Sequence, residues 1–157
     1  MKDKVHYQKL NKDNIKYLRK KVKTLDRKSI VSRYGQVLNP KQIIESCEAS
    51  QLTFLVYKGN YLAGYGQVFR LKKQKYPEIG YMIFPKFRNK GLGFMLTRRI
   101  MNYCLKKHIK LKGEANIPNK ASIGLLRKIS KLYTPVKAFR NTNYEPNTFV
   151  WYWNFGN

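Results

Sequence analysis

The sequence predicts a mixed α/β fold, in which helices flank a central sheet that is mostly antiparallel but contains one parallel crossover. Apolar residues recur at helical spacing in several stretches, and short runs rich in β-branched and aromatic residues lie between them. Turns containing glycine or asparagine separate the runs that are expected to pair as hairpins. A strand, helix and strand in succession over residues 78–115 have the length of a right-handed βαβ crossover.

The first half of the chain is expected to form two helices and a hairpin. Residues 12–23 carry apolar side chains at helical spacing, and residues 39–49 begin with Asn-Pro, which is typical of a helix cap followed by the first helical residue. Residues 52–57 and 61–71 are expected to pair across a Gly-Asn turn. Within the second of these strands, the pattern Gly64-Tyr65-Gly66 indicates a bulge or close packing rather than a dinucleotide site, because no helix follows it.

The second half is expected to supply the crossover, another helix and a final hairpin. An apolar strand over residues 78–84 precedes a helix over residues 94–107 and a strand over residues 109–115. Asn119 can cap the next helix. The apolar face of that helix is predicted to contain Ile123, Leu125, Leu126, Ile129 and Leu132. Segments 136–140 and 148–155 are predicted to pair as antiparallel strands. Alternate aromatic residues of the last strand are expected to fill the core.

Length and composition predict one domain spanning residues 1–157, with 43% hydrophobic content. The absence of a long apolar run argues against a membrane partner, and the N-terminus lacks the apolar segment of a signal peptide, so a cytoplasmic protein is expected. Cys47 and Cys104 lie far apart on predicted helices, and with two histidines they form no metal-ligand spacing. Buried free thiols and no metal are expected.

The net charge of +25 is the most unusual feature of the composition. A field of this sign attracts polyanions, so nucleic acid is a possible partner, as are anionic lipid and a phosphorylated cofactor. The excess is mostly lysine spread along the chain rather than one block. A lysine-rich genome is therefore an equally good explanation for most of it.

A short basic loop with two glycines joins the apolar strand to the helix that follows. Gly91 and Gly93 allow the backbone to approach a ligand, and the first turn of a helix carries N–H groups without partners. Arg88 and Lys90 add positive charge. The loop is therefore a candidate anion site for phosphate or pyrophosphate. The alternative is that the glycines only permit a tight turn and the cations are solvated.

Three motifs in this order resemble the GNAT acetyltransferase superfamily, and most closely its ribosomal-protein N-terminal acetyltransferase branch. The loop Arg88-Asn89-Lys90-Gly91-Leu92-Gly93 resembles the acyl-CoA loop Arg/Gln-x-x-Gly-x-Gly/Ala. Glu78-Ile79-Gly80-Tyr81, followed by Pro85 and Arg88, is similar to the branch's strand-to-loop spacing. The segment from Asn116 through Asn119 to Ser122 is similar to its Asn-x-x-Ser helix start. The resemblance implies a GNAT-like fold and acetyl-CoA as cosubstrate.

The same resemblance implies a set of cofactor-binding residues. The pyrophosphate would lie on the loop, the pantetheine arm beside the end of the strand, and the thioester sulfur near the start of the later helix. The implied residues are Met82, Ile83, Phe84, Arg88, Asn89, Lys90, Gly91, Leu92, Gly93, Asn119 and Ser122.

Two residues are the candidates for catalysis of amine attack on the thioester. Glu78 is the best candidate for the base, because members of the superfamily often use a carboxylate on this strand, and Ser122 is the best candidate for donating to the departing thiolate. Each has an ordinary structural alternative. Glu78 can be a strand-start carboxylate paired with a lysine, and Ser122 can be a first-turn residue whose side chain caps the backbone.

The chain departs from the superfamily's pattern on the acceptor side. Many members place a tyrosine four residues after the serine as general acid, and here that residue is Leu126. The Gly-Phe that commonly closes the helix is replaced by Ser130-Lys131. Tyr133 or Tyr144 can supply a hydroxyl from elsewhere, but the sequence gives neither of them a position.

These features predict an acetyl-CoA-dependent N-acetyltransferase, an acyltransferase acting on a primary amine. The acceptor can be a protein N-terminus or lysine, an aminoacyl-tRNA or a small amine. The alternative is a catalytically silent GNAT-like module that binds RNA or the ribosome through its basic surface. The sequence leaves open a monomer or a homodimer, and an acetyl or a longer acyl group.

Overall fold

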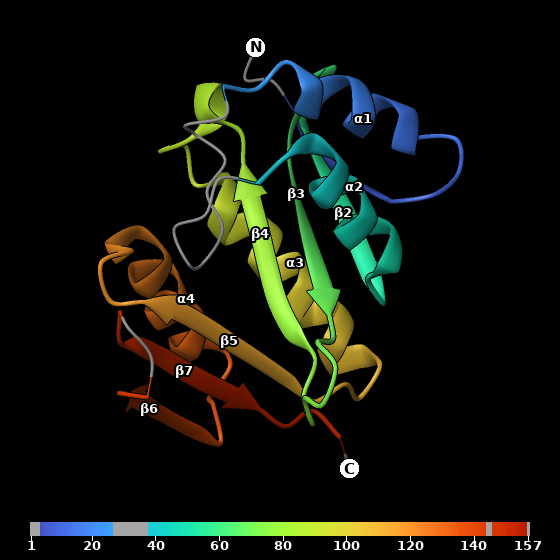
Figure 1. Ribbon diagram of the computed structural model, residues 1–157. Coiled ribbons are helices and arrows are strands. Elements are labelled where there is room, and N and C mark those ends of the chain that lie inside the picture. Colours follow the sequence, from blue (N-terminus) through green and yellow to red (C-terminus); the bar gives the residue numbers. More distant parts are fainter. Residues whose placement is uncertain (1–3, 27–37, 144–145, 157) are drawn as a thin grey trace.

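The computed structural model describes residues 4–26, 38–143 and 146–156, which form a seven-stranded sheet in the order β1-β2-β3-β4-β5-β7-β6 (Figure 1). Neighbouring strands are antiparallel except for β4 and β5, which are parallel. This confirms the predicted mixed, mostly antiparallel sheet. The strands are β1 (Val5–Lys9), β2 (Leu52–Lys58), β3 (Tyr61–Phe69), β4 (Glu78–Ile83), β5 (Leu111–Asn116), β6 (Lys137–Asn141) and β7 (Thr148–Trp153).

Helices cover both faces of the sheet. α1 (Ile15–Lys23) and α2 (Pro40–Ala49) pack together over β2 and β3, whereas α3 (Leu92–Lys106) and α4 (Lys120–Leu132) pack together on the opposite face (Figure 1). A 3₁₀ turn, η2 (Pro85–Phe87), connects β4 toward α3. No helix of the described segments is long and apolar enough to cross a membrane.

Local sequence signals account for most element boundaries. α2 begins as predicted, because Asn39 accepts a hydrogen bond from the N–H of Gln42 and the Gln42 side chain accepts one from the N–H of Asn39. The hairpin of β2 and β3 turns at residues 58–61, as expected. Cys47 and Cys104 are buried free thiols. Trp153 is fully buried, in agreement with the expected packing of alternate aromatic residues in β7.

One strand and the position of one residue differ from expectation. β1 was not predicted, because its five residues, Val-His-Tyr-Gln-Lys, lack clear apolar alternation and none is fully buried. The strand exists because it completes hydrogen bonds along the open edge of β2, from Val5 opposite Lys58 to Lys9 opposite Phe54. Leu132 was expected on the apolar face of α4 but is 56% exposed, since it ends the helix beyond the packed region.

Gly64 and Gly66 serve close packing, as predicted. The register between β2 and β3 shifts after Val56, leaving an irregularity beside Gly64. A Cβ atom at Gly64 would lie 2.3 Å from the carbonyl oxygen of Met82 on β4, and one at Gly66 would lie 2.7 Å from Ile100 of α3. The glycines therefore allow β3 to lie close to β4 and to α3.

The strands β4 and β5 form a fork, which is the feature that positions the site. They pair at Glu78 and Lys112, where the N–H of Lys112 also donates to the carbonyl oxygen of Pro77 at 2.8 Å. Beyond this pair the two strands diverge toward their carboxyl ends (Figure 1). The opening faces the loop that precedes α3 and the first turn of α4. Carboxyl ends of parallel strands are where open α/β sheets bind ligands.

Candidate active site

Two cavities lie along the fork. The first, here called the loop cavity, has a volume of about 710 Å³ and is formed by the end of β4, the loop of residues 88–91 and the first turns of α3 and α4. The second, here called the fork cavity, has a volume of about 270 Å³ and lies among β3, β4, β5 and α4. Both cavities are lined by Tyr81, Met82, Asn119 and Ser122. These residues therefore mark the junction of the two cavities.

The backbone before α3 has the conformation of an anion site. Gly91 has a φ of 75° and is the N-cap residue of α3, which has no side-chain cap and no acidic residue in its first turn. Asn89 also has a positive φ, 58°. Gly91, Leu92 and Gly93 line the loop cavity, so the cavity lies at the N-terminus of the helix, where unpaired N–H groups and the helix dipole favour negative charge.

The two cations of the loop brace its backbone. Arg88 donates from Nε to the carbonyl oxygen of Ile83 at 2.9 Å, and Lys90 donates from Nζ to the carbonyl oxygen of Lys86 at 3.1 Å. Arg88 lines the loop cavity, whereas Lys90 does not. Of the two predicted cations, Arg88 is therefore part of the site and Lys90 is not.

Most of the implied cofactor-binding residues lie together. Phe84 is an exception, because its side chain is 1% exposed in the core and its N–H donates to the carbonyl oxygen of Ala63 at 2.9 Å. Lys90 is the other exception. The residues brought together at the loop cavity are Met82, Ile83, Arg88, Asn89, Gly91, Leu92, Gly93, Asn119 and Ser122.

Gly93 lets α3 pack closely against its neighbours. A Cβ atom there would lie 3.1 Å from Cδ1 of Leu125 on α4 and 3.5 Å from the Tyr81 ring on β4. The second glycine of the loop therefore has a packing role that its spacing alone did not specify.

The first turn of α4 leaves the Ser122 hydroxyl at the cavity junction. The side chain of Asn119 accepts a hydrogen bond from the N–H of Ser122 at 3.1 Å, so Asn119 caps the helix as predicted. The Ser122 hydroxyl lies 3.0 Å from the Tyr81 hydroxyl. Ser122 is thus the capped residue, and its hydroxyl contacts a side chain from another element.

Glu78 lies in the fork cavity beside two other charged side chains. Its carboxylate is 3.1 Å from Nζ of Lys112, which also donates to Glu114 at 2.8 Å. All three side chains are at most 10% exposed. The lysine pairing considered as the alternative for Glu78 is therefore present, and its role as base stays a prediction.

Lys112 is held in its charged form. Burial by itself lowers the pKa of Lys112, but the hydrogen bond to Glu114 and the charges of Glu78 and Glu114 outweigh it, and the net pKa is raised. Glu114 was missed in the sequence, although the two-residue spacing from Lys112 places both side chains on one face of the strand.

Tyr81 is the other residue that sequence reasoning missed as a functional candidate. It comes from β4, and burial raises the pKa of its phenol while the hydrogen bond with Ser122 lowers it in part. The only local signal was its position on the strand that carries Glu78. Its partner is 41 residues away in the chain.

The structure shows the positions of residues at which the chain differs from the superfamily's acceptor-side pattern. Leu126 is 3% exposed and lines the fork cavity without a polar group. The hydroxyl of Tyr133 donates to Asn102 on α3, and Tyr133 lines neither cavity. Ser130 donates to the carbonyl oxygen of Arg127 at 2.8 Å. Tyr144 lies outside the described residues.

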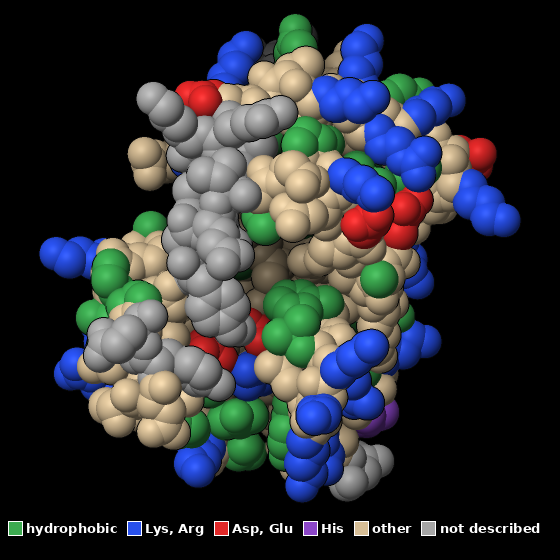
Figure 2. Space-filling view, in the orientation of Figure 1, with side chains coloured by type: hydrophobic (Ala, Val, Ile, Leu, Met, Phe, Trp, Pro, Cys, Tyr) green, Lys and Arg blue, Asp and Glu red, His purple; other side chains and the backbone are tan. Residues whose placement is uncertain are grey.

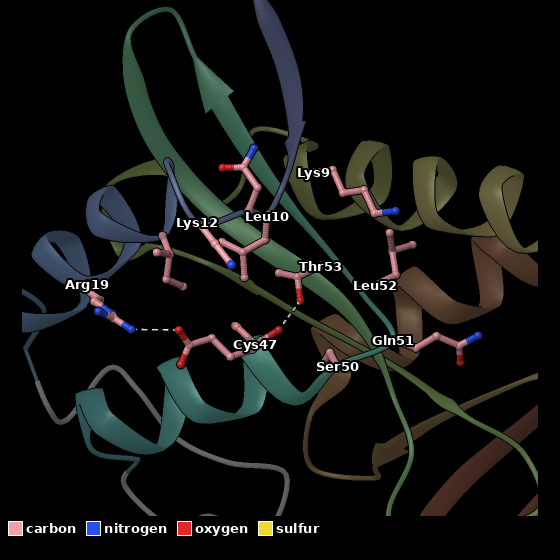
Figure 3. Close-up of a pocket in the computed structure, with 12 residues that line it drawn as sticks. Lys9, Leu10, Lys12, Arg19, Cys47, Ser50, Gln51, Leu52 and Thr53 are labelled. Atoms are coloured by element: carbon pink, nitrogen blue, oxygen red, sulfur yellow. Dashed lines mark hydrogen bonds and ion pairs between the residues drawn. The ribbon is translucent and has the colours of Figure 1, made fainter.

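A third hollow, of about 460 Å³, lies between α1, α2 and the β1–β2 edge (Figure 3). Arg19 pairs with Glu48 at 2.8 Å, and Thr53 donates to the carbonyl oxygen of Cys47 at 2.9 Å. Burial, with a smaller effect of the Glu48 charge, raises the pKa of Cys47 to about 12. The thiol is therefore protonated at neutral pH and is no candidate nucleophile.

On the face seen in Figure 2, lysines and arginines lie at several places, and many of them are close together at the upper right. This distribution agrees with the even spread of lysine along the sequence. The basic side chains of that face are therefore not confined to one patch.

Comparisons with known proteins agree with the fold and the motifs. A sequence profile described as the acetyltransferase (GNAT) family matches residues 22–130, and the chain belongs to this family. A search of curated proteins found no match. The structure is also similar to many solved ones at low sequence identity.

Three of these solved structures illustrate the similarity. The yncA protein of Salmonella typhimurium, solved with its cofactor acetyl-CoA, is 12% identical over 98% of this chain and 95% of that chain, with a TM-score of 0.73. The ribosomal-protein-S18-alanine N-acetyltransferase of Escherichia coli is 12% identical over 98% and 96%, with a TM-score of 0.68. An acetyl transferase of Salmonella typhimurium that modifies the N-terminal serine of ribosomal protein L7/L12 is 13% identical over 96% and 94%, with a TM-score of 0.69.

Proposed function

We propose that the protein transfers an acetyl group from acetyl-CoA to the primary amine of a protein N-terminus. The observation that carries the proposal is the junction of two cavities at Tyr81, Met82, Asn119 and Ser122. One cavity ends at an uncapped helix N-terminus suited to phosphate, and the other contains buried carboxylates. A donor and an acceptor entering from opposite sides would meet at this junction.

The loop cavity fits the acyl-CoA donor. Pyrophosphate binds on the N–H groups of residues 91–93, which line the cavity where positive φ at Asn89 and Gly91 shapes the loop. The pantetheine arm follows Met82 and Ile83, because these residues line the cavity at the end of β4. The thioester then reaches Asn119 and Ser122 at the start of α4.

The fork cavity fits the amine acceptor. Transfer requires that the attacking nitrogen be neutral, so an ammonium group must first lose a proton. Glu78 accepts that proton, directly or through water. Lys112 holds Glu78 and Glu114 at 3.1 Å and 2.8 Å and so fixes their orientation. The neutral nitrogen then attacks the thioester carbon.

Two lines of support favour a protein N-terminus as the acceptor. The Glu78 strand motif and the Asn119-to-Ser122 helix start are similar to those of ribosomal-protein N-terminal acetyltransferases. Structures of the same fold include one described as a ribosomal-protein-S18-alanine N-acetyltransferase and one described as modifying the N-terminal serine of ribosomal protein L7/L12. The catalytically silent RNA-binding alternative is not favoured, because family membership and the joined cavities both favour a transferase.

Calorimetry with acetyl-CoA tests the donor half of the proposal. Wild type is expected to bind, and Gly91→Glu to weaken binding at least about tenfold by placing a carboxylate at the pyrophosphate position. Gly91→Ala is the matched control: it imposes the same backbone strain, but an added Cβ meets no atom within 4 Å. It should retain binding within about threefold. Wild type that does not bind acetyl-CoA overturns the proposal.

Labelling tests the acceptor half. The protein is incubated with isotopically labelled acetyl-CoA and a cell extract, and the label is located by mass spectrometry. Label on the α-amino group of one or a few proteins is expected. Label confined to lysine side chains, to RNA or to small amines overturns the acceptor assignment while leaving the transferase in place.

A further inference from the structure

Two hydroxyl groups from different elements meet at the cavity junction. The Tyr81 hydroxyl lies 3.0 Å from that of Ser122, a distance at which one donates a hydrogen bond to the other. Tyr81 extends from β4 and Ser122 from the first turn of α4. The pair therefore links β4 to the first turn of α4, at the opening of the fork.

The pair lies at the junction of the two cavities, which is where the proposed function has the bond to sulfur break. Of the residues shared by the two cavities, Tyr81 and Ser122 carry hydroxyls, whereas Met82 and Asn119 do not. The side-chain oxygen of Asn119 accepts a hydrogen bond from the N–H of Ser122, and this side chain carries no O–H group. Leu126, one turn further along α4, faces the fork cavity with an apolar side chain. Among the described residues at the junction, the hydroxyl pair is thus the available O–H donor.

We propose that Tyr81 is a positioning residue that donates its O–H to Ser122 and so directs the Ser122 O–H toward the departing thiolate. The assignment rests on the proposed acetyl-CoA-dependent function and adds a second member to the thiolate site. A hydroxyl that accepts one hydrogen bond becomes a stronger donor of its own, because the chain is polarised cooperatively. The chain therefore stabilises negative charge on sulfur as that charge develops.

The step balances without a net proton from Tyr81. The N–C bond forms as the neutral amine attacks, and the C–S bond breaks with its electron pair remaining on sulfur. The base has by then released to solvent the proton that it took from the ammonium group, and it accepts a second proton from the nitrogen after the attack. The thiolate leaves with one negative charge. Both hydroxyls keep their protons. Burial raises the pKa of Tyr81 and so keeps the phenol protonated at neutral pH.

The affinity for the free thiol of CoA, measured against pH, tests the assignment without requiring the acceptor. A thiol with a pKa of about 8.5 is mostly thiolate at about pH 9.5, whereas acetyl-CoA has no such group. For wild type, the ratio of CoA affinity to acetyl-CoA affinity is expected to rise about tenfold between pH 7 and pH 9.5. The reason is that hydrogen bonds to charged groups, such as the thiolate, are strong.

The variants separate a role in thiolate binding from a role in packing. Tyr81→Phe keeps the ring beside Gly93 and should reduce the tightening below about threefold, while acetyl-CoA affinity changes less than about twofold. Ser122→Ala should do the same, and the double variant should add little, because the residues act as one chain. Tyr133→Phe, which removes a hydroxyl outside both cavities, should keep the full tightening.

Two results would overturn the assignment. One is wild type that binds acetyl-CoA but shows no extra tightening for CoA at high pH. The other is Tyr81→Phe that retains the tightening in full. Wild type that binds neither molecule instead overturns the proposed function, and the thiolate assignment fails with it.

Discussion

Nζ of Lys112 lies 3.1 Å from the Glu78 carboxylate at the register pair that joins the parallel strands β4 and β5. The same ammonium donates to Glu114 at 2.8 Å. The ion pair therefore sits where the fork closes, and the cavity opens immediately beyond it. Lys112 therefore contributes both to the stability of the fork and to the orientation of Glu78, the candidate base.

Removing that lysine should destabilise the protein strongly. Lys112→Met leaves two carboxylates buried without their cation, and breaking a buried pair by removing one partner costs about 3–5 kcal/mol. Urea unfolding at neutral pH measures the change. Lys41→Met is the control, since Lys41 pairs with Glu45 on the surface, with side chains 82% and 61% exposed, and exposed pairs contribute about 0–1 kcal/mol. Equal effects of the two substitutions would contradict a structural role for Lys112.

The pH dependence of stability should show the same lysine at alkaline pH. The pKa of Lys112 is raised above the ordinary value of 10.5, so the folded state holds this proton more tightly than the unfolded state. The stabilisation is complete below about pH 10.5 and is lost as the pH rises through the folded pKa. Wild type should lose free energy of unfolding more steeply than Lys112→Met above about pH 10.5. Parallel curves for the two proteins would argue against this linkage.

Glu78→Gln should remove the acid limb of the pH–rate profile. A general base typically contributes a factor of about 10²–10⁴, so turnover should fall within this range and become flatter with pH. Glu114→Gln is the comparison, because Glu114 contacts the same lysine but is not the predicted base. It should keep the pH dependence of wild type. If the limb disappears in Glu114→Gln instead, the two carboxylates have exchanged roles.

Gly64→Ala should destabilise the sheet. The added Cβ would lie 2.3 Å from the Met82 carbonyl oxygen, and a backbone atom cannot rotate away as a side chain can. Overpacking of this kind costs about 1–3 kcal/mol or more, measurable as a lowered urea midpoint. Gly124→Ala on α4 meets no atom within 4 Å and should instead raise stability by about 0.5–1 kcal/mol. A neutral Gly64→Ala would show that β3 can move away from β4 at little cost.

Gly93→Val should damage binding more than folding. Even a Cβ atom would lie 3.1 Å from Cδ1 of Leu125, so a branched side chain must displace the Leu125 side chain and is expected to widen the cavity junction. Stability should fall by about 1–3 kcal/mol, and acetyl-CoA affinity should fall beyond the loss seen with Gly91→Ala. Calorimetry and urea unfolding on the same samples separate the two effects. Unchanged affinity would remove Gly93 from the site.

The fold was predicted where the signals are local and strong. The Asn39-Pro40 cap, the Gly-Asn turn of the hairpin and the apolar runs each determine a structure within a few residues. β1 was missed because its stability comes from the edge of β2, which is distant in sequence, and not from its own side chains. Leu132 was misplaced because periodicity does not indicate where a helix leaves the core.

The candidate site likewise contains residues that local sequence signals predicted and residues that they did not. The anion loop is contiguous, so Gly91 and its neighbours could be recognised from spacing alone. Glu78 and Ser122 were named from the resemblance, and the structure places both at the joined cavities, while their catalytic roles stay predictions. Tyr81 carried no comparable signal, because its partner Ser122 lies on another element, and Glu114 was missed because the carboxylate that shares Lys112 with it, Glu78, lies on another strand.

The sequence by itself determined the class of fold, the turn before α3 and the family's motifs, since each depends on residues that are neighbours along the chain. Only the tertiary structure decided what surrounds those motifs. The divergence of β4 and β5 beyond Glu78 and Lys112 opens the fork, and the packing of α4 against α3 brings Ser122 to Tyr81. These contacts join residues far apart in sequence, and no local pattern encodes the distance between two hydroxyl groups on different elements.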